Sequence, residues 1–230
     1  MKALLLAAGP GTRLRPLTND IPKCLVPIRG KPLLAHWLDL LLPGGIEEVL
    51  VNTHYLSEQV RVFRTLSRWR DRIVLVHEPE LLGTGGTVRA NRQYFGRTPF
   101  LLAHADNLTR FSVADFQASH VNRPPGTAMT MMTFDTDTPQ SCGIVELDER
   151  GVVRSFHEKI SNPPGRRANG AVYILEPEIV DFIASRDNSS ADFSTEVIPK
   201  YIGRIATFHN GDFHRDIGSP QSLLAAEREY

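Results

Sequence analysis

The stretch Lys2-Ala3-Leu4-Leu5-Leu6-Ala7-Ala8-Gly9-Pro10-Gly11-Thr12-Arg13 joins an apolar run directly to a glycine-rich turn. The run is too short for the core of a signal peptide and no cleavage pattern follows it, so we interpret Ala3–Ala8 as a buried strand. A glycine-rich turn after a strand exposes backbone N–H groups and lets a phosphate group approach them closely. We therefore predict an α/β fold in which Gly9, Gly11 and Thr12 bind phosphate. A plain turn from strand to loop is the alternative.

Further apolar runs alternate with amphipathic segments, as parallel strands joined by helices do. The predicted strands are Ala3–Ala8, Glu48–Asn52, Ile73–His77, Phe100–His104 and Ala128–Thr133, and the predicted helices are Leu33–Leu42, Ser57–Trp69, Thr84–Tyr94 and Val113–Val121. Three alternating segments, Gly143–Asp148, Val152–Glu158 and Ala168–Leu175, come later, and 162–165 and 185–192 read as loops. We predict a Rossmann-like mixed, mostly parallel sheet with helices on both faces and a smaller antiparallel lobe.

Composition excludes several classes of protein. The 26 basic and 26 acidic residues cancel, so the chain lacks the positive field that dominates binding to nucleic acid. Only two cysteines, Cys24 and Cys142, are present and they lie far apart in the sequence, which argues against a disulfide framework or a four-ligand zinc site and favours a reducing cytoplasm. No apolar run reaches the length of a membrane span. We therefore expect neither nucleic acid nor membrane as a partner, and the sequence leaves open whether the protein is a monomer or a homo-oligomer.

The glycine-rich turn matches neither of two common nucleotide motifs. A dinucleotide fingerprint needs a third glycine where Leu14 stands, and a P-loop needs Gly-Lys-Ser/Thr at its end. Ten residues after Arg13, two prolines stiffen the segment that presents Lys23, one of only five lysines beside 21 arginines. A compact ammonium suits a phosphate group that moves during transfer, although Lys23 as a solvated surface charge is an equally good interpretation of the segment alone.

Taken together, the motifs resemble those of the sugar-1-phosphate nucleotidyltransferases, the nucleotide-sugar pyrophosphorylases. The likeness rests on residues 5–18 with Pro22–Pro27, and then on residues 82–86, 105–107, 158–159, 169–173 and 216–220. Mannose-1-phosphate and heptose-1-phosphate guanylyltransferases are the most similar members in these motifs. The resemblance implies one domain, 1–230, with a nucleotide-binding half at 1–135 and a sugar-phosphate-binding half at 136–230.

The reaction that the resemblance implies joins a nucleoside triphosphate to a sugar 1-phosphate and releases pyrophosphate. Arg13, Lys23 and Asp106 are the implied catalytic residues, and Asp106 and Asp216 are the implied ligands of Mg²⁺, which prefers one or two carboxylates. Asp216 also precedes a helix that Ser219 would cap, so a structural role is its alternative. The family usually has glycine before the first aspartate, whereas this chain has Ala105, whose methyl group would intrude where the nucleotide passes.

The resemblance also assigns the substrate-binding residues. Gly83 and Gly85 would let the nucleotide lie on the backbone, and Glu78 falls near the base-reading position, where a carboxylate could accept the two adjacent donors of guanine. The sugar phosphate would be bound by Glu158, Lys159, Asn169 and Gly170. Glu78 could instead face solvent, the Glu-Lys pair could be a surface dipeptide, and Asn169-Gly170 could be a hairpin turn. GTP is slightly favoured as donor; alternatives are UTP, dTTP or CTP with another phosphorylated acceptor, and a nucleotide-sugar sensor without catalysis.

Overall fold

The computed structural model describes residues 1–186 and 192–230. The chain forms two compact units that each draw on distant segments. Unit 1 comprises residues 1–81, 103–113 and 212–230, and unit 2 comprises residues 82–102 and 114–211. The chain therefore leaves unit 1 and returns to it twice, and each unit is described by itself.

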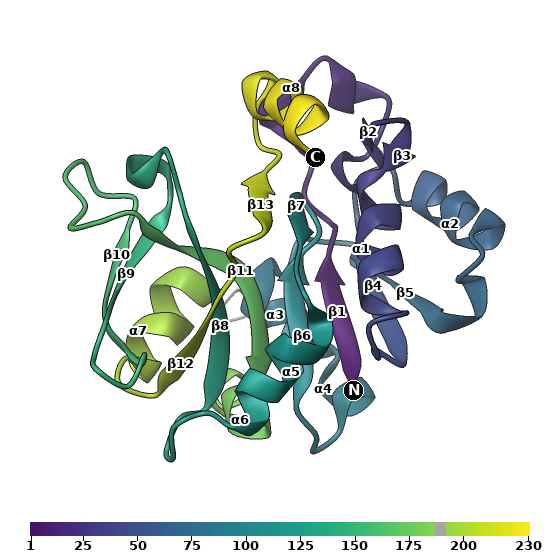
Figure 1. Ribbon diagram of the computed structural model, residues 1–230. Helices are drawn as coiled ribbons and strands as arrows, with labels where there is room; N and C mark the ends of the chain where they lie inside the picture. The colour runs from purple at the N-terminus through teal and green to yellow at the C-terminus, as the bar shows by residue number, and fades with distance from the viewer. Residues whose placement is uncertain (187–191) are drawn as a thin grey trace. The chain divides into compact units, whose positions relative to one another are not determined.

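Parallel strands form the centre of unit 1. Strands β1 (Lys2–Leu6), β4 (Glu48–Thr53) and β5 (Ile73–His77) lie in the order β1-β4-β5, with Leu4 opposite Leu50 and Leu50 opposite Val74, and Figure 1 shows them side by side. Buried side chains line β1 and β4, as expected for strands covered on both faces. The carboxyl ends of these strands meet at one edge, where the glycine-rich turn begins.

Helices and two small sheets complete unit 1. Helix α1 (Leu33–Leu41) buries five of its nine residues, α2 (Ser57–Leu66) buries Val60, and α8 (Pro220–Glu229) starts at a Ser219 cap. The small antiparallel pairs are β2 (Pro27–Ile28) with β3 (Lys31–Pro32), and β7 (Asn107–Arg110) with β13 (Phe213–Asp216). The second pair joins the middle of the chain to its last segment.

Unit 2 is built on mostly antiparallel strands. Strands β9 (Gly143–Leu147), β10 (Val153–Glu158), β11 (Arg167–Leu175) and β8 (Met129–Asp135) pair antiparallel, and β12 (Ile205–His209) pairs parallel with β8. Its helices are α3 (Gly83–Ala90), α4 (Arg92–Phe95), α6 (Pro177–Ala184) and α7 (Ile198–Tyr201). Strand β6 (Phe100–His104) and helix α5 (Val113–Val121) contain residues of both units.

The predicted fold class is confirmed, with shifts at element ends. The predicted helix Thr84–Tyr94 is two helices because the chain breaks at Asn91, whose side-chain amide donates to the Thr87 carbonyl (2.8 Å). The predicted helix Ser57–Trp69 ends at Leu66, since Ser67 accepts the Trp69 N–H through its hydroxyl. The predicted loop at 185–192 falls mostly on residues 187–191, outside the described part.

Within the described residues, no helix is long and apolar enough to cross a membrane. The predicted nucleotide-binding half, 1–135, and sugar-phosphate-binding half, 136–230, describe binding roles, and they stay a prediction. The two compact units are defined by packing and have different boundaries.

Candidate active site

The glycine-rich turn after β1 is held by a buried threonine. Gly11 has a left-handed backbone (φ +63°), and a Cβ there would lie 3.0 Å from Lys23 Cβ and 3.1 Å from Thr18 Cγ2. The fully buried Thr18 donates its hydroxyl to the Gly11 carbonyl (2.8 Å), which also accepts the Leu14 N–H (2.9 Å). Glycine is therefore required here by backbone conformation and by space.

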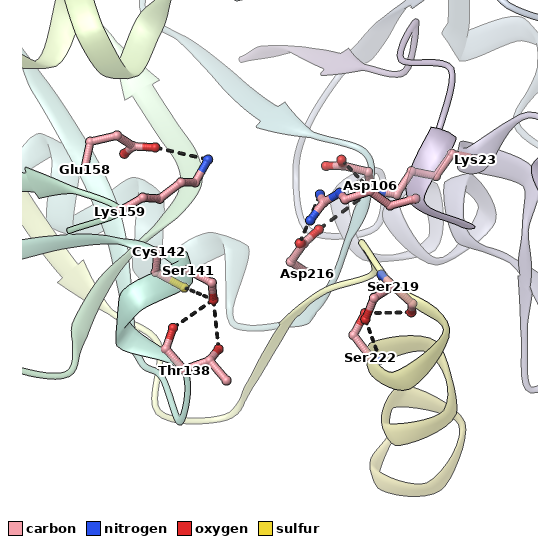
Figure 2. A network of polar contacts seen from close by, with 11 residues as sticks. Lys23, Asp106, Thr138, Ser141, Cys142, Glu158, Lys159, Asp216, Ser219 and Ser222 are labelled. Carbon is pink, nitrogen blue, oxygen red and sulfur yellow. Dashed lines mark hydrogen bonds and ion pairs between the residues drawn. The ribbon is translucent and has the colours of Figure 1, made fainter. Parts of the chain in front are cut away.

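Lys23 extends from a short 3₁₀ turn, Lys23–Leu25, that begins after Pro22. Its side chain is only 8% exposed, and Nζ lies 2.7 Å from Asp106 Oδ2 and 3.7 Å from Asp216 Oδ1. Figure 2 shows the lysine beside both carboxylates. A buried ammonium is tolerated only when it is paired, so Lys23 is not a solvated surface charge.

The two aspartates meet because β7 pairs with β13. Asp106 follows β6 and directly precedes β7, while Asp216 ends β13 opposite Asn107. The Ile217 N–H also donates to the Asp106 carbonyl (3.1 Å). Backbone pairing thus brings two carboxylates, 110 positions apart in the sequence, to one ammonium.

The pKa values of the two carboxyl groups shift in opposite directions from their usual value. Burial raises the pKa of Asp106, but the nearby Lys23 ammonium and His104 outweigh it and leave that pKa below its usual value. Burial raises the pKa of Asp216 above its usual value, opposed by Lys23 and reinforced by the negative charge of Asp106. Burial is thus outweighed by nearby positive charge at Asp106 but not at Asp216, and an additional cation beside them would favour the ionised form of both groups.

Arg13 approaches the same pair from the turn. Its Nη2 lies 3.7 Å from Asp216 Oδ2, and both side chains are exposed. Gly218, which the sequence prediction did not include, makes this approach possible: a Cβ there would collide with Asp216 Oδ2 and lie 2.7 Å from Arg13 Nη2. Its only signal was its place in the motif that follows Asp216.

A pocket of about 170 Å³ lies among these groups. Its lining residues are Gly9, Pro10, Gly11, Thr12, Arg13, Leu14, Lys23, Asp106 and Gly218. The structure thus brings seven of the predicted site residues together. Six of them line the pocket, namely Gly9, Gly11, Thr12, Arg13, Lys23 and Asp106, and Asp216 lies beside Lys23 and Arg13. Ala105 is fully buried, donates its N–H to the Leu6 carbonyl (3.0 Å) and is not among the residues that line this pocket; the effect of its methyl group on a passing nucleotide stays a prediction.

Glu78 lies just beyond β5 and is 3% exposed. Its Oε1 accepts a hydrogen bond from Asn52 Nδ2 (3.0 Å), and its backbone N–H donates to the Thr53 carbonyl (2.8 Å). The carboxylate therefore does not face open solvent, which removes that alternative. Asn52 was absent from the predicted site, because a polar residue ending an apolar strand carries no signal of its own.

Within unit 2, Gly83 and Gly85 lie in the first turn of α3, as predicted. Gly83 has a left-handed backbone (φ +69°), and its carbonyl accepts the Thr87 hydroxyl (3.0 Å). Gly85 is buried. The start of α3 is thus a glycine-dependent turn, and its role in nucleotide binding stays a prediction.

Glu158 and Lys159 lie where β10 ends, also in unit 2. Lys159 Nζ is 3.2 Å from Glu158 Oε1, and a dashed line marks this ion pair in Figure 2. Lys159 has a left-handed backbone (φ +49°), and its N–H donates to the Cys142 carbonyl (3.2 Å). Such a conformation is uncommon for a residue with a side chain and marks positions worth testing for function.

Asn169 and Gly170 lie within β11 at an irregularity of its pairing with β8. Asn169 Oδ1 accepts the Ala171 N–H (2.9 Å), and its Nδ2 donates to the Tyr173 hydroxyl (2.7 Å). The position is a bulged strand, not a hairpin turn. The amide builds that bulge, and its contact with a sugar stays a prediction.

Comparison with known proteins gives a consistent result. Residues 2–230 match the family model described as nucleotidyl transferase. The chain is 30% identical to mannose-1-phosphate guanyltransferase 2 of Candida glabrata and 32% identical to probable mannose-1-phosphate guanylyltransferase 2 of Arabidopsis thaliana, with 100% of this chain aligned in each case. It spans only 64% and 65% of the length of these two relatives.

Solved structures match over nearly the whole chain. HddC from Yersinia pseudotuberculosis, complexed with GMP-PN, matches with a TM-score of 0.82 and 25% identity, covering 98% of this chain and 97% of that one. A putative glucose-1-phosphate thymidylyltransferase from Bacillus anthracis matches with a TM-score of 0.87 and 17% identity, covering 99% of this chain and 94% of that one. The second likeness concerns the fold.

Proposed function

The chain belongs to the nucleotidyl transferase family, and from this premise we propose that it transfers a nucleotidyl group from a nucleoside triphosphate to a sugar 1-phosphate. The names of its relatives in Candida glabrata and Arabidopsis thaliana favour GTP as donor and mannose 1-phosphate as acceptor. Heptose 1-phosphate is a further acceptor to test. The products would be a nucleoside diphosphate sugar and pyrophosphate.

The meeting of Lys23, Asp106, Asp216 and Arg13 beside the glycine-rich turn carries the proposal. In the reaction, an oxygen of the sugar phosphate forms a bond to the α-phosphorus, and the bond to the oxygen bridging the β-phosphate breaks. Pyrophosphate leaves with that electron pair. A phosphate monoester is largely dianionic at pH 7, so no general base is needed.

The protein's task is then to align two anions and to neutralise the charge that builds on the α-phosphate. Backbone N–H groups of the turn would bind the phosphates of the donor. Lys23 and Arg13 supply the positive charges. Lys23 is well suited, since its ammonium is held at a fixed place by Asp106.

The donor set fits Mg²⁺, because two carboxylates converge on one cation and hard oxygen ligands are those that Mg²⁺ prefers. Asp106 and Asp216 would hold the ion. When bound, Mg²⁺ would neutralise charge on the triphosphate.

Other residues are assigned to the substrates. Glu78 would read the base, and Gly83 and Gly85 would let the nucleotide approach the backbone. Glu158 would accept hydrogen bonds from sugar hydroxyls and Lys159 would bind the sugar phosphate, with Asn169 and Gly170 beside the sugar. The two cysteines are free thiols, which favours a reducing cytoplasm as the site of the reaction.

Pyrophosphate release tests the proposal. Purified protein with Mg²⁺ is mixed with GTP, UTP, dTTP or CTP and with mannose, heptose, glucose or amino-sugar 1-phosphates. We expect release with at least one pair, and the highest kcat/KM with GTP. Tight binding of a nucleotide sugar with no release from any pair would instead indicate a sensor.

A further inference from the structure

Asn52 lies at the centre of a hydrogen-bonded chain across the sheet edge of unit 1. It belongs to the end of β4, opposite Leu6 of β1 on one side and Val76 of β5 on the other. Its Oδ1 accepts the N–H of Ala7 (2.7 Å), and its Nδ2 donates to Glu78 Oε1 (3.0 Å). Ala7 lies two positions before Gly9, where the phosphate-binding turn begins.

The orientation of this amide is fixed by its two partners. A backbone N–H can only donate, so the Asn52 oxygen must face Ala7, and the nitrogen must then face the carboxylate of Glu78. Asn52 and Glu78 are each 3% exposed. The Asn52 amide therefore has a single orientation, because its oxygen and its nitrogen each make a hydrogen bond. Its nitrogen in turn restricts the position of the Glu78 carboxylate.

We infer that Asn52 is a positioning residue for donor specificity, which fixes the Glu78 carboxylate as a hydrogen-bond acceptor for guanine and ties it to the start of the phosphate-binding turn. This inference rests on the proposed function, in which Glu78 reads the base. Asn52 touches no substrate; it acts through Glu78 and Ala7.

Guanine and hypoxanthine separate this role from a merely structural one. Guanine presents an N1–H and a 2-amino group to a carboxylate, whereas hypoxanthine lacks the amino group. A correctly placed carboxylate should distinguish GTP from ITP by roughly 10- to 100-fold, since a hydrogen bond to a charged group is lost. If the Glu78 carboxylate points away from the base, the protein should bind GTP and ITP with equal affinity.

The experiment is calorimetric titration of the protein with GTP and with ITP in the presence of Mg²⁺. For wild-type protein we expect Kd for ITP to exceed Kd for GTP by roughly 10-fold or more. Asn52→Asp has the same shape and keeps the acceptor for Ala7, but its ionised carboxylate cannot donate to Glu78 and repels the Glu78 carboxylate. We expect it to bring the two Kd values within about threefold of each other, mainly by weakening GTP binding.

Thr53→Val is the matched control, because Thr53 is the next residue, is equally buried, and donates its hydroxyl to the Val76 carbonyl (3.3 Å). It should keep the wild-type ratio of Kd values. In the Glu78→Gln background, Asn52→Asp should change the ratio no further, since Asn52 acts through Glu78. The thermal unfolding of each variant is measured as well, so that a general loss of folding is distinguished from a specific change in the ratio of Kd values.

Two results would overturn the inference. One is that Asn52→Asp raises the Kd for GTP and the Kd for ITP by the same factor. The other is that the wild-type protein binds GTP and ITP with equal Kd. These outcomes differ from failure of the proposed function, which is the absence of pyrophosphate release from every donor and acceptor pair.

Discussion

Two glycine residues, which have no side chain, shape the site as much as the charged residues do. Gly218 lies where a Cβ would collide with Asp216 and crowd Arg13, and Gly11 lies where a Cβ would press on Lys23 and Thr18. Lys23 and Asp106 could be named from motifs in the sequence. Thr18, Asn52 and Gly218 could not, because their importance depends on what lies across from them in the fold.

Gly218→Ala should separate Arg13 from Asp216, because the new methyl group needs the space where the two side chains approach each other. We expect kcat/KM for pyrophosphate release to fall by roughly 10-fold or more, the loss typical of a displaced charged partner. Gly211→Ala is the control, since nothing lies within 4 Å of a Cβ there. Equal rates for both variants would show that the close approach is irrelevant.

Lys23→Ala removes the buried ammonium between the two carboxylates. We expect a loss of about 2–4 kcal/mol of transition-state stabilisation, by analogy with a lost electrostatic donor, measured as kcat under saturating substrates. Lys31→Ala serves as control: Lys31 pairs with Asp39 (2.6 Å) away from the pocket lining. A Lys23→Ala protein that keeps the wild-type kcat would exclude the lysine from the reaction.

At the scale of elements, local pattern predicted the buried strands but not the pairing that builds the site. Leu4, Leu5 and Val51 belong to apolar runs, so β1 and β4 were recognisable. Strands β7 and β13, with the sequences Asn-Leu-Thr-Arg and Phe-His-Arg-Asp, show no such run. Their pairing across about a hundred residues brings Asp216 to Asp106, and no local pattern encodes that partnership.

Helix α8 offers a test of an element that was predicted from sequence. The Ser219 hydroxyl accepts a hydrogen bond from the Ser222 N–H (3.1 Å), and the Ser222 hydroxyl accepts one from the Ser219 N–H (3.0 Å). Ser219→Ala should lower the free energy of unfolding by about 1 kcal/mol, measured by urea denaturation. Ser185→Ala, which removes a hydroxyl at the exposed end of α6, should cost less. A larger loss in the control would contradict the capping role.

At the scale of the whole molecule, stability should depend on a buried histidine in unit 2. His120 is 3% exposed, with Nδ1 2.8 Å from Thr130 Oγ1. Burial, assisted by the charge of Arg123, lowers its pKa from 6.5 to about 4. The native protein therefore resists protonation in a range where the unfolded chain accepts a proton.

Below pH 6.5 the unfolded state binds more protons at His120 than the native state does, so stability falls as the pH drops. The loss should approach about 3 kcal/mol near pH 4 and is measured by urea denaturation between pH 7 and 4. His120→Gln should unfold with a shallower pH dependence across this range. An unchanged slope in that variant would assign the pH dependence to other groups.

The central claim is that Asp106 and Asp216, brought together by β7 and β13, act as a pair in nucleotidyl transfer. The most direct measurement is the rate of pyrophosphate release, at saturating GTP, acceptor and Mg²⁺, for Asp106→Ala, Asp216→Ala and the control Asp212→Asn, which removes an exposed carboxylate paired with Arg110 (3.0 Å). We predict that the first two fall by at least about 100-fold while circular dichroism stays native and the control keeps its rate. Wild-type rates in folded Asp106→Ala and Asp216→Ala proteins would contradict the claim.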